Sequence, residues 1–158
     1  MIIEYSSQYE EAVKDLLIEL QEYIVRIDKE GYNNLTDDYR DKYFKKTIKE
    51  TEKYEGKMFL YEENGKIVGL VVGVINNDEI DTYDFKAPKR GRVTELIVSK
   101  DYRGKNCGKL LLKKVEDYLI ECGCKDILIG VFGYNDLAIH FYEKNGYHTR
   151  MIEMTKKF

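Results

Sequence analysis

A short run of basic and small residues in the second half of the chain has the composition of an anion-binding turn. Between Val98 and Leu110 the sequence reads Ser-Lys-Asp-Tyr-Arg-Gly-Lys-Asn-Cys-Gly-Lys. Gly104 and Gly108 let the backbone approach a ligand closely, and Asn106 tolerates the left-handed conformation that glycine would otherwise supply. A helix that begins after such a turn offers free N–H groups and a favourable dipole to an anion. The run therefore predicts a pyrophosphate-binding turn, and a basic loop that caps a helix without a ligand is the alternative. Four basic side chains surround it: Lys100, Arg103, Lys105 and Lys109.

A second set of residues has the spacing of one helical face that could lie along a ligand. Asn135, Ala138 and Tyr142 are spaced at i, i+3 and i+7, so a helix would place them on one face. Ala138 is small enough to admit a ligand chain along this face, and Tyr142 would then point at the end of that chain. A phenol with an ordinary pKa of about 10 stays protonated at neutral pH and can donate its proton. Core packing is the alternative for Tyr142, because the chain has 14 tyrosines.

The hydrophobic pattern predicts the elements that must position these residues. Asn64-Gly65 predicts a tight hairpin turn. Gly69 and Gly73 predict a bulge or a close approach within the strand that follows, and the apolar run at 127–131 predicts a buried central strand. The predicted strands are residues 1–5, 58–61, 67–75, 93–98, 127–131 and 147–156, and the predicted helices are residues 8–28, 37–52, 108–122 and 135–144. The order β-α-α-β-β-β-α-β-α-β predicts a mixed α/β sheet rather than a doubly wound fold.

Length and composition predict one soluble domain over residues 1–158. No apolar run approaches the ~20 residues of a membrane span, and the first residues do not form a signal peptide. Three cysteines without an export signal predict free thiols in the cytoplasm. The spacing Cys122-Gly-Cys124 and the presence of only two histidines argue against a metal site. The net charge of −3 argues against nucleic acid as a partner, although residues 100–114 could form a basic face.

The two sets of residues together resemble the GNAT superfamily of N-acetyltransferases. Arg103-Gly104-Lys105-Asn106-Cys107-Gly108 is similar to the family pattern R/Q-x-x-G-x-G/A, with Asn106 where the family usually has glycine. Residues 135–147 are similar to the second pattern, N-x-x-A-x-x-F-Y-x-K/R-x-G-F/Y, in which Lys144 is the basic residue. The resemblance covers residues 58–156, and the element order extends it to the whole chain. It implies a mixed, mostly antiparallel central sheet flanked by helices.

This resemblance implies that acetyl-CoA is the cosubstrate and that its acetyl group passes directly to a primary amine in a ternary complex. The pantetheine would pair with the strand backbone at Leu96, Ile97 and Val98, where an N–H group could stabilise the oxyanion. Tyr142 would protonate the departing thiolate, and Cys107 would be a small filler rather than a nucleophile. The residues implied to hold acetyl-CoA are Leu96, Ile97, Val98, Arg103, Gly104, Lys105, Asn106, Cys107, Gly108, Lys109, Asn135, Ala138, Tyr142 and Lys144.

The attacking amine must lose a proton, and Glu95 is the candidate base. Strand alternation would place Glu95 with Ile97 on one face unless a bulge intervenes; an exposed or structurally paired glutamate is the alternative. In the resembling family the acceptor site includes segments that correspond here to residues 31–38 and 76–84, which are acidic with interleaved tyrosines. They favour a cationic acceptor such as an aminoglycoside, a polyamine, a lysine side chain or a peptide N-terminus, although solvated surface would look the same. An inactive CoA-binding module is the alternative function, and family analogy leaves a homodimer open.

Overall fold

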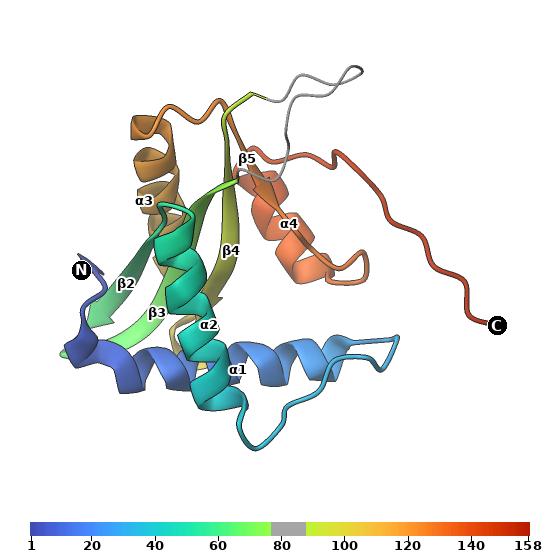
Figure 1. The fold of residues 1–158 in the computed structure, drawn as a ribbon, viewed down its shortest axis with the longest axis horizontal. Helices are drawn as coiled ribbons and strands as arrows, with labels where there is room; N and C mark the ends of the chain where they lie inside the picture. The colour runs from blue at the N-terminus through green and yellow to red at the C-terminus, as the bar shows by residue number, and fades with distance from the viewer. Residues whose placement is uncertain (77–87) are drawn as a thin grey trace.

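The computed structural model describes residues 1–76 and 88–158. The first half of the chain contains one short strand, two helices and a long hairpin, and the second half alternates strands and helices (Figure 1). The elements are β1 (Ile2–Glu4), α1 (Glu10–Ile27), α2 (Tyr39–Lys53), β2 (Lys57–Glu63), β3 (Lys66–Asn76), β4 (Arg90–Val98), α3 (Cys107–Glu121), β5 (Asp126–Ile129) and α4 (Asp136–Lys144). Short 3-10 turns precede α1 (Ser7–Tyr9) and follow β4 (Lys100–Tyr102).

The five strands form one sheet in the order β1-β2-β3-β4-β5. All neighbours are antiparallel except β4 and β5, which are parallel. The β2–β3 hairpin turns at Asn64 and Gly65, whose φ angles of 52° and 75° are both positive, as a type I′ turn requires. The predicted fold class, a mixed and mostly antiparallel sheet flanked by helices, is therefore confirmed.

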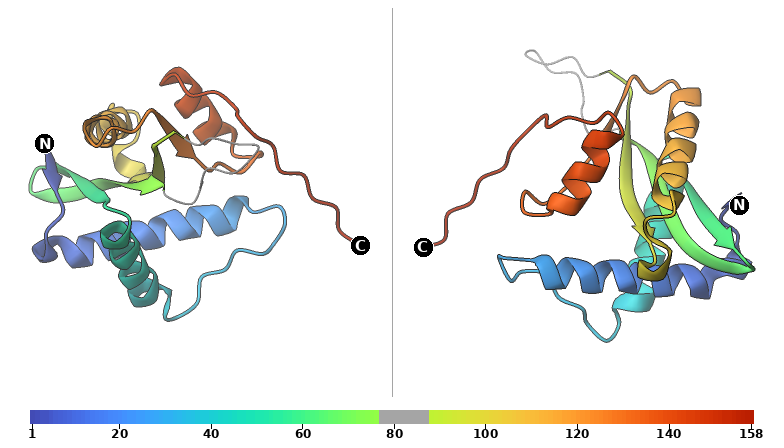
Figure 2. Two further views of the ribbon diagram at one scale, coloured as in Figure 1. Left: turned by 45° about the horizontal axis from the view of Figure 1, so that its top comes forward. Right: turned by 180° about the vertical axis from the view of Figure 1, so that it is seen from behind.

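Helices cover both faces of the sheet (Figure 2). α1 and α2 pack on one face, where Val13, Leu17 and Phe44 join side chains of β2 and β3 in one core cluster. α3 packs on the other face, where Leu111, Val115 and other side chains form a second cluster. α4 joins this second cluster through Phe141 and Tyr142. We call these two sides the α2 face and the α3 face.

The seam between β3 and α3 depends on a glycine. A Cβ at Gly73 would lie 2.2 Å from Cγ2 of Val115 and 3.3 Å from Cδ1 of Leu119. The predicted close approach at this glycine is therefore present, and α3 supplies it. Because a contact of 2.2 Å is impossible for real atoms, any larger residue at this position would push α3 away from the sheet.

A bulge in β4 changes which side chains share a face. Val72 of β3 is paired with Glu95, but the next residue, Gly73, is paired with Val93, so Thr94 is an extra residue. Beyond the bulge the predicted alternation holds: Ile97 packs in the α2-face cluster, whereas Leu96 packs in the α3-face cluster. Before the bulge the parity is reversed, and Val93 packs on the α3 face.

The last predicted strand, residues 147–156, does not form. In the described part of the chain, residues 145–158 contain no helix or strand, and they run away from α4 as an extended tail (Figure 1). Met151 and Ile152 are each 76% exposed. A strand also needs a neighbouring strand to pair with, and the described residues provide none for this segment. β5 is consequently the last strand of the sheet and only half-buried, instead of the central strand that its apolar sequence predicted.

None of the described helices has both the length and the apolar character needed to cross a bilayer.

Candidate functional site

The turn between β4 and α3 has the backbone conformation of an anion-binding turn. Gly104 has a φ of 78°, and Asn106 adopts the left-handed conformation (φ 68°, ψ 0°) directly before the first residue of α3. Asn106 thus takes the conformation expected of the glycine that it replaces. The Asn106 side chain does not cap the start of α3, and the first turn of this helix contains no acidic residue. The N–H groups at Cys107, Gly108 and Lys109 therefore lie at an uncapped helix N-terminus, where an anion is favoured.

Arg103 connects this turn to β4 and α1. Its Nε donates to the carbonyl of Val98 at 2.8 Å, and its Nη2 lies 3.4 Å from Glu19 of α1. The same Glu19 carboxylate accepts the N–H of Lys100 at 2.8 Å. Glu19 lies 84 residues before Arg103, and no sequence pattern connects the two. Of the other predicted residues here, Lys105 and Lys109 are exposed, and Cys107 is buried with 2% exposure, as a packing residue would be.

One edge of β4 is open beside the turn. β5 is paired with β4 only between Arg90 and Val93, opposite residues 126–129. β4 continues to Val98, so on this edge Leu96, Ile97 and Val98 have no strand partner among the described residues. The two parallel strands stop pairing at the bulge, and this leaves backbone N–H and C=O groups available to an extended ligand.

Tyr142 of α4 lies on the α3 face near this edge. Its ring packs edge-on against Phe141 and Tyr147, with ring centroids 5.3 Å and 5.7 Å away. Burial, and secondarily the charge of Glu95, raises the pKa of Tyr142 to about 12. The described part of the chain provides no hydrogen-bond partner for its hydroxyl. Tyr142 is thus a protonated phenol at neutral pH with an uncommitted hydrogen-bond donor.

Glu95 lies on the opposite, α2 face of the same strand. It is 9% exposed, and its Oε1 accepts the hydroxyl of Tyr43 at 2.7 Å. Burial raises the pKa of Glu95 to about 7, although the Tyr43 hydrogen bond and the charge of Lys46 act to lower it. Glu95 can therefore exchange a proton near neutral pH, as a general base must. Tyr43 was not expected from the sequence; its only signal was the helical i, i+4 spacing with Tyr39, on which it stacks at 4.8 Å.

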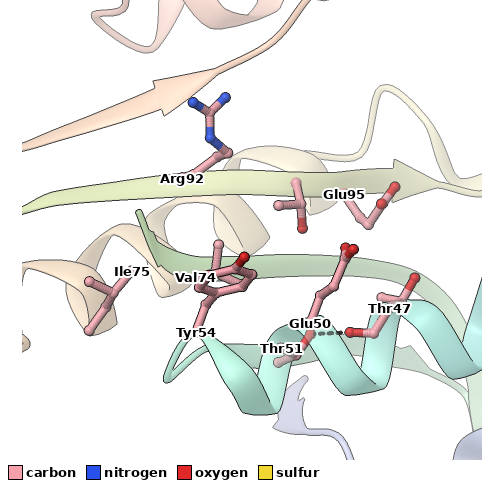
Figure 3. A pocket seen from close by; sticks show the side chains of 9 residues that line it. Thr47, Glu50, Thr51, Tyr54, Val74, Ile75, Arg92 and Glu95 are labelled. Atoms are coloured by element: carbon pink, nitrogen blue, oxygen red, sulfur yellow. Dashed lines mark hydrogen bonds between the residues drawn. The ribbon is translucent and has the colours of Figure 1, made fainter. Parts of the chain in front are cut away.

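A cavity of about 210 Å³ adjoins Glu95 between β4 and α2 (Figure 3). Glu50 rises from α2 toward β4, and Arg92 is directed away from α2. The bulge places both Thr94 and Glu95 in the lining. The lining residues are Thr47, Glu50, Thr51, Tyr54, Val74, Ile75, Arg92, Thr94 and Glu95. None of the α2 residues was among those expected to bind a substrate.

Asn135 lies between α1 and α4, and its side-chain oxygen accepts two hydrogen bonds. It is the N-cap of α4: its Oδ1 accepts the N–H of Ala138 at 3.3 Å and the hydroxyl of Tyr23 at 2.9 Å. Its side-chain oxygen thus connects α1 to α4. Ala138 is half-buried, as a position beside a ligand could be, and Lys144 is exposed at the end of α4.

The two segments expected to line the acceptor site are residues 31–38 and 76–84. In residues 31–38, Tyr32 is 74% exposed, and the backbone N–H groups of Tyr32 and Asn33 bond to Asp28. From the segment 76–84, residues 77–84 lie outside the described residues.

The arrangement brings four features together around one strand end. An uncapped helix N-terminus lies beside an open strand edge, with a proton donor on one side of the strand and a proton acceptor on the other. Such a site can bind an anionic, extended ligand along the edge and can move protons at both of its sides.

Comparison with known proteins agrees with this geometry. Residues 18–147 match the family model described as the acetyltransferase (GNAT) family. The chain is 37% identical over 98 residues to an acetyltransferase of Yersinia pestis (strain Pestoides F), a match that covers 61% of this chain and 62% of that protein. The matched region is thus less than two thirds of the length of this relative.

Two solved structures show the same fold. A mutant of the BH1408 protein from Bacillus halodurans has a TM-score of 0.82 at 19% identity, covering 100% of this chain and 99% of the other. The aminoglycoside N-acetyltransferase AAC(6')-Iy, in complex with the bisubstrate analogue CoA-S-monomethyl-acetylneamine, has a TM-score of 0.72 at 14% identity, covering 100% and 98%. With the family match over residues 18–147, these findings show that the chain belongs to the GNAT family of acetyltransferases.

Proposed function

We propose that residues 1–158 form one N-acetyltransferase domain that moves the acetyl group of acetyl-CoA to a primary amine in the cytoplasm. The observation that carries this proposal is the open edge of β4, which lies between the proton donor Tyr142 and the proton acceptor Glu95. The family match agrees with this chemistry.

The described residues fit acetyl-CoA in two places. The left-handed Asn106 and the uncapped start of α3 suit its pyrophosphate. The unpaired edge at Leu96, Ile97 and Val98 suits the amide groups of its pantetheine arm. An N–H group of Ile97 or Val98 would then donate to the thioester oxygen as negative charge develops there.

The proposed reaction forms a carbon–nitrogen bond and breaks a carbon–sulfur bond, and proton transfers accompany both changes. Glu95 takes a proton from the acceptor ammonium, and the neutral nitrogen forms a bond to the acetyl carbon. The carbon–sulfur bond breaks, and the Tyr142 hydroxyl gives its proton to the departing sulfur. The nitrogen, which still carries one proton more than the product amide, releases it to solvent, and the Tyr142 phenolate takes up a proton to restore its hydroxyl. Because the donor and the acceptor lie on opposite sides of β4, thiol and amine can approach from opposite sides in one ternary complex.

The acceptor is proposed to be a small cationic amine, such as an aminoglycoside or polyamine, or an amine of a protein or peptide. The carboxylates of Glu50 and Glu95 at the cavity support a cation. The fold neighbour that was solved with a CoA–acetylneamine analogue is an aminoglycoside N-acetyltransferase.

The test is release of free thiol from acetyl-CoA across a panel of primary amines. Tyr142→Phe should lower kcat by roughly 10²-fold, because the departing sulfur loses its acid, while CoA affinity stays near normal. Tyr118→Phe is the matched control, since its hydroxyl bonds the Glu55 carbonyl away from the site. An unchanged kcat in Tyr142→Phe would remove this tyrosine from the mechanism. CoA binding without turnover on any amine would instead identify an inactive CoA-binding module.

A further inference from the structure

The cavity between β4 and α2 contains a buried carboxylate with a free oxygen. Glu95 is 9% exposed and lines this cavity. Its Oε1 accepts the Tyr43 hydroxyl, whereas its Oε2 has no hydrogen-bond partner among the described residues. A buried oxygen of this kind is costly unless a ligand supplies a donor.

The threonine and glutamate side chains that α2 contributes to the cavity lining can only accept further hydrogen bonds, whereas Tyr54, which follows α2, accepts from Lys53 and keeps a hydroxyl donor. The hydroxyl of Thr47 donates to the Tyr43 carbonyl at 3.0 Å, and that of Thr51 donates to the Thr47 carbonyl at 2.7 Å. The hydroxyl of Tyr43 already donates its hydrogen bond to Glu95, and the carboxylate of Glu50 offers only acceptor oxygens. Figure 3 shows the threonine hydroxyls turned along the helix while Glu50 reaches toward β4. The α2 wall therefore suits a ligand that carries several N–H donors.

The charges around the cavity favour a cation with two charged groups. The charge of Glu50 is one of the causes that raise the pKa of Glu95, so the two carboxylates repel each other. Lys46 lies 3.9 Å from Glu50, but both side chains are half-exposed or more, so this pair is screened by solvent. Arg92, on the far wall, is directed away from α2. A ligand with two ammonium groups would relieve the repulsion between the carboxylates.

Lys46, which is outside the cavity lining, shows that a primary ammonium can lie beside Glu50 and an aromatic ring. Its Nζ lies 5.6 Å from the centre of the Tyr43 ring, within the range of a cation–π contact, and it approaches Glu50 from the solvent side. The cavity volume of about 210 Å³ is well above the space that a single water needs. This room suits a short aliphatic chain.

We infer that the cavity is the acceptor site for a short aliphatic diamine or polyamine, with the reacting nitrogen at Glu95 and a second ammonium at Glu50. Glu50 is then the residue that selects acceptors with two charges. The assignment of a reacting nitrogen depends on the proposed acetyltransferase activity, but diamine binding in the cavity does not.

The experiment compares 1,4-diaminobutane with 1-aminobutane, which has the same chain and one charge fewer. Wild-type protein should have a kcat/KM at least tenfold higher for the diamine, measured by thiol release from acetyl-CoA. Glu50→Gln should reduce this preference about tenfold, mainly by raising the KM for the diamine. Glu52→Gln, on the same helix but outside the cavity lining, should keep the wild-type preference.

Calorimetric titration of the diamine without acetyl-CoA separates this inference from the proposed function. Diamine binding that Glu50→Gln weakens, with no thiol released for any amine, would support the cavity and overturn the activity. Thiol release with other amines, but without preference for the diamine and without diamine binding, would overturn the inference and keep the activity. Equal preference for the diamine in Glu50→Gln and wild type would also overturn the inference. Circular dichroism is the control that shows whether the variant is folded.

Discussion

At the scale of single residues, the site depends on residues whose backbone conformation or side-chain pKa differs from that of the free amino acid in water. Asn106 is kept in the left-handed region, and Glu95 has a pKa of about 7 because it is buried. Burial also raises the pKa of Tyr142, so the proposed acid stays protonated while the proposed base is ionised in part. The same strand thus separates two titrating groups whose environments suit opposite roles.

Glu95→Gln tests the base. Activity of the wild type should rise as the pH increases through about 7, because Glu95 must be ionised to accept a proton. The variant should lose roughly 10²–10⁴-fold in kcat and should lack this rise. The free energy of unfolding should show the opposite trend: the folded state keeps the Glu95 proton up to about pH 7, but the unfolded chain releases it near 4.5, so this contribution falls as the pH rises between these values. A pH–rate profile that Glu95→Gln leaves unchanged would exclude this role.

Gly108→Ala distinguishes an effect on the free energy of unfolding from an effect on CoA affinity. A Cβ at Gly108 would lie 3.5 Å from Phe141 and 3.6 Å from Val98, which are ordinary contacts. Alanine in the first turn of α3 should therefore leave the free energy of unfolding unchanged or raise it by up to about 1 kcal/mol. CoA affinity should fall about tenfold, because the methyl group would keep the pyrophosphate from the backbone. Glu121→Ala at the other end of α3 is the control for both measurements, and full CoA affinity in Gly108→Ala would place the pyrophosphate elsewhere.

At the scale of elements, the seam between α3 and the sheet sets the position of the anion-binding turn. Gly73 allows Val115 and Leu119 of α3 to lie directly on β3. The bulge at Thr94 ends the pairing of β4 with β5 and opens the edge beside the start of the same helix. Helix packing and strand divergence thus place the turn and the open edge next to each other.

Gly73→Ala should destabilise the fold by about 1–3 kcal/mol, because the added methyl group would overlap Val115. Urea unfolding measures this loss. Val115→Ala is also expected to be destabilising, since it leaves a cavity, but it removes the atom that clashes. The double variant should therefore lose less than the sum of the two single variants. If the two single losses in the free energy of unfolding are strictly additive in the double variant, the overlap of residue 73 with Val115 is relieved by some other movement.

At the scale of the whole molecule, the end of α1 is tied to the start of α4. Tyr23 bonds Asn135, 112 residues away, and Tyr134 bonds Asp28 at 3.1 Å. Asp28 also accepts the backbone N–H groups of Glu30, Tyr32 and Asn33, together with the Asn33 side chain. These bonds connect the first helix and the loop after it to the helix that contains Tyr142.

Acid should weaken this connection. Hydrogen bonds from the Asn33 backbone and side chain, with those from Glu30 and Tyr134, hold the pKa of Asp28 well below its usual range. A lowered pKa in the folded state gives stability that is complete above the unfolded value of 3.8 and is lost as the pH falls below it. The melting temperature should therefore fall on acidification, and Asp28→Asn should lower it at pH 7 and reduce its dependence on acid. Asp37→Asn, at an exposed position, is the control; equal acid dependence in Asp28→Asn and wild type would contradict this account.

The sequence determined the features that depend on residues close together in the chain. The hairpin at Asn64-Gly65, the left-handed Asn106 and most helix and strand positions follow from local backbone preferences and hydrophobic spacing. The two motifs also predicted the family, because each is a local pattern of residue types. The last predicted strand failed, since a strand requires a partner and a buried face, and its own residues supply neither.

The tertiary structure decided which distant residues meet. Tyr43 bonds Glu95 across 52 residues and Glu19 meets Arg103 across 84, and neither pair has a pattern that a single sequence reveals. The structure also decided that Glu95 is buried, that Thr94 is a bulge, and that α2 forms the wall of a cavity. The physical reason is that burial and long-range hydrogen bonds depend on how the helices pack on the sheet, whereas turns and helix ends depend on a few neighbouring dihedral angles.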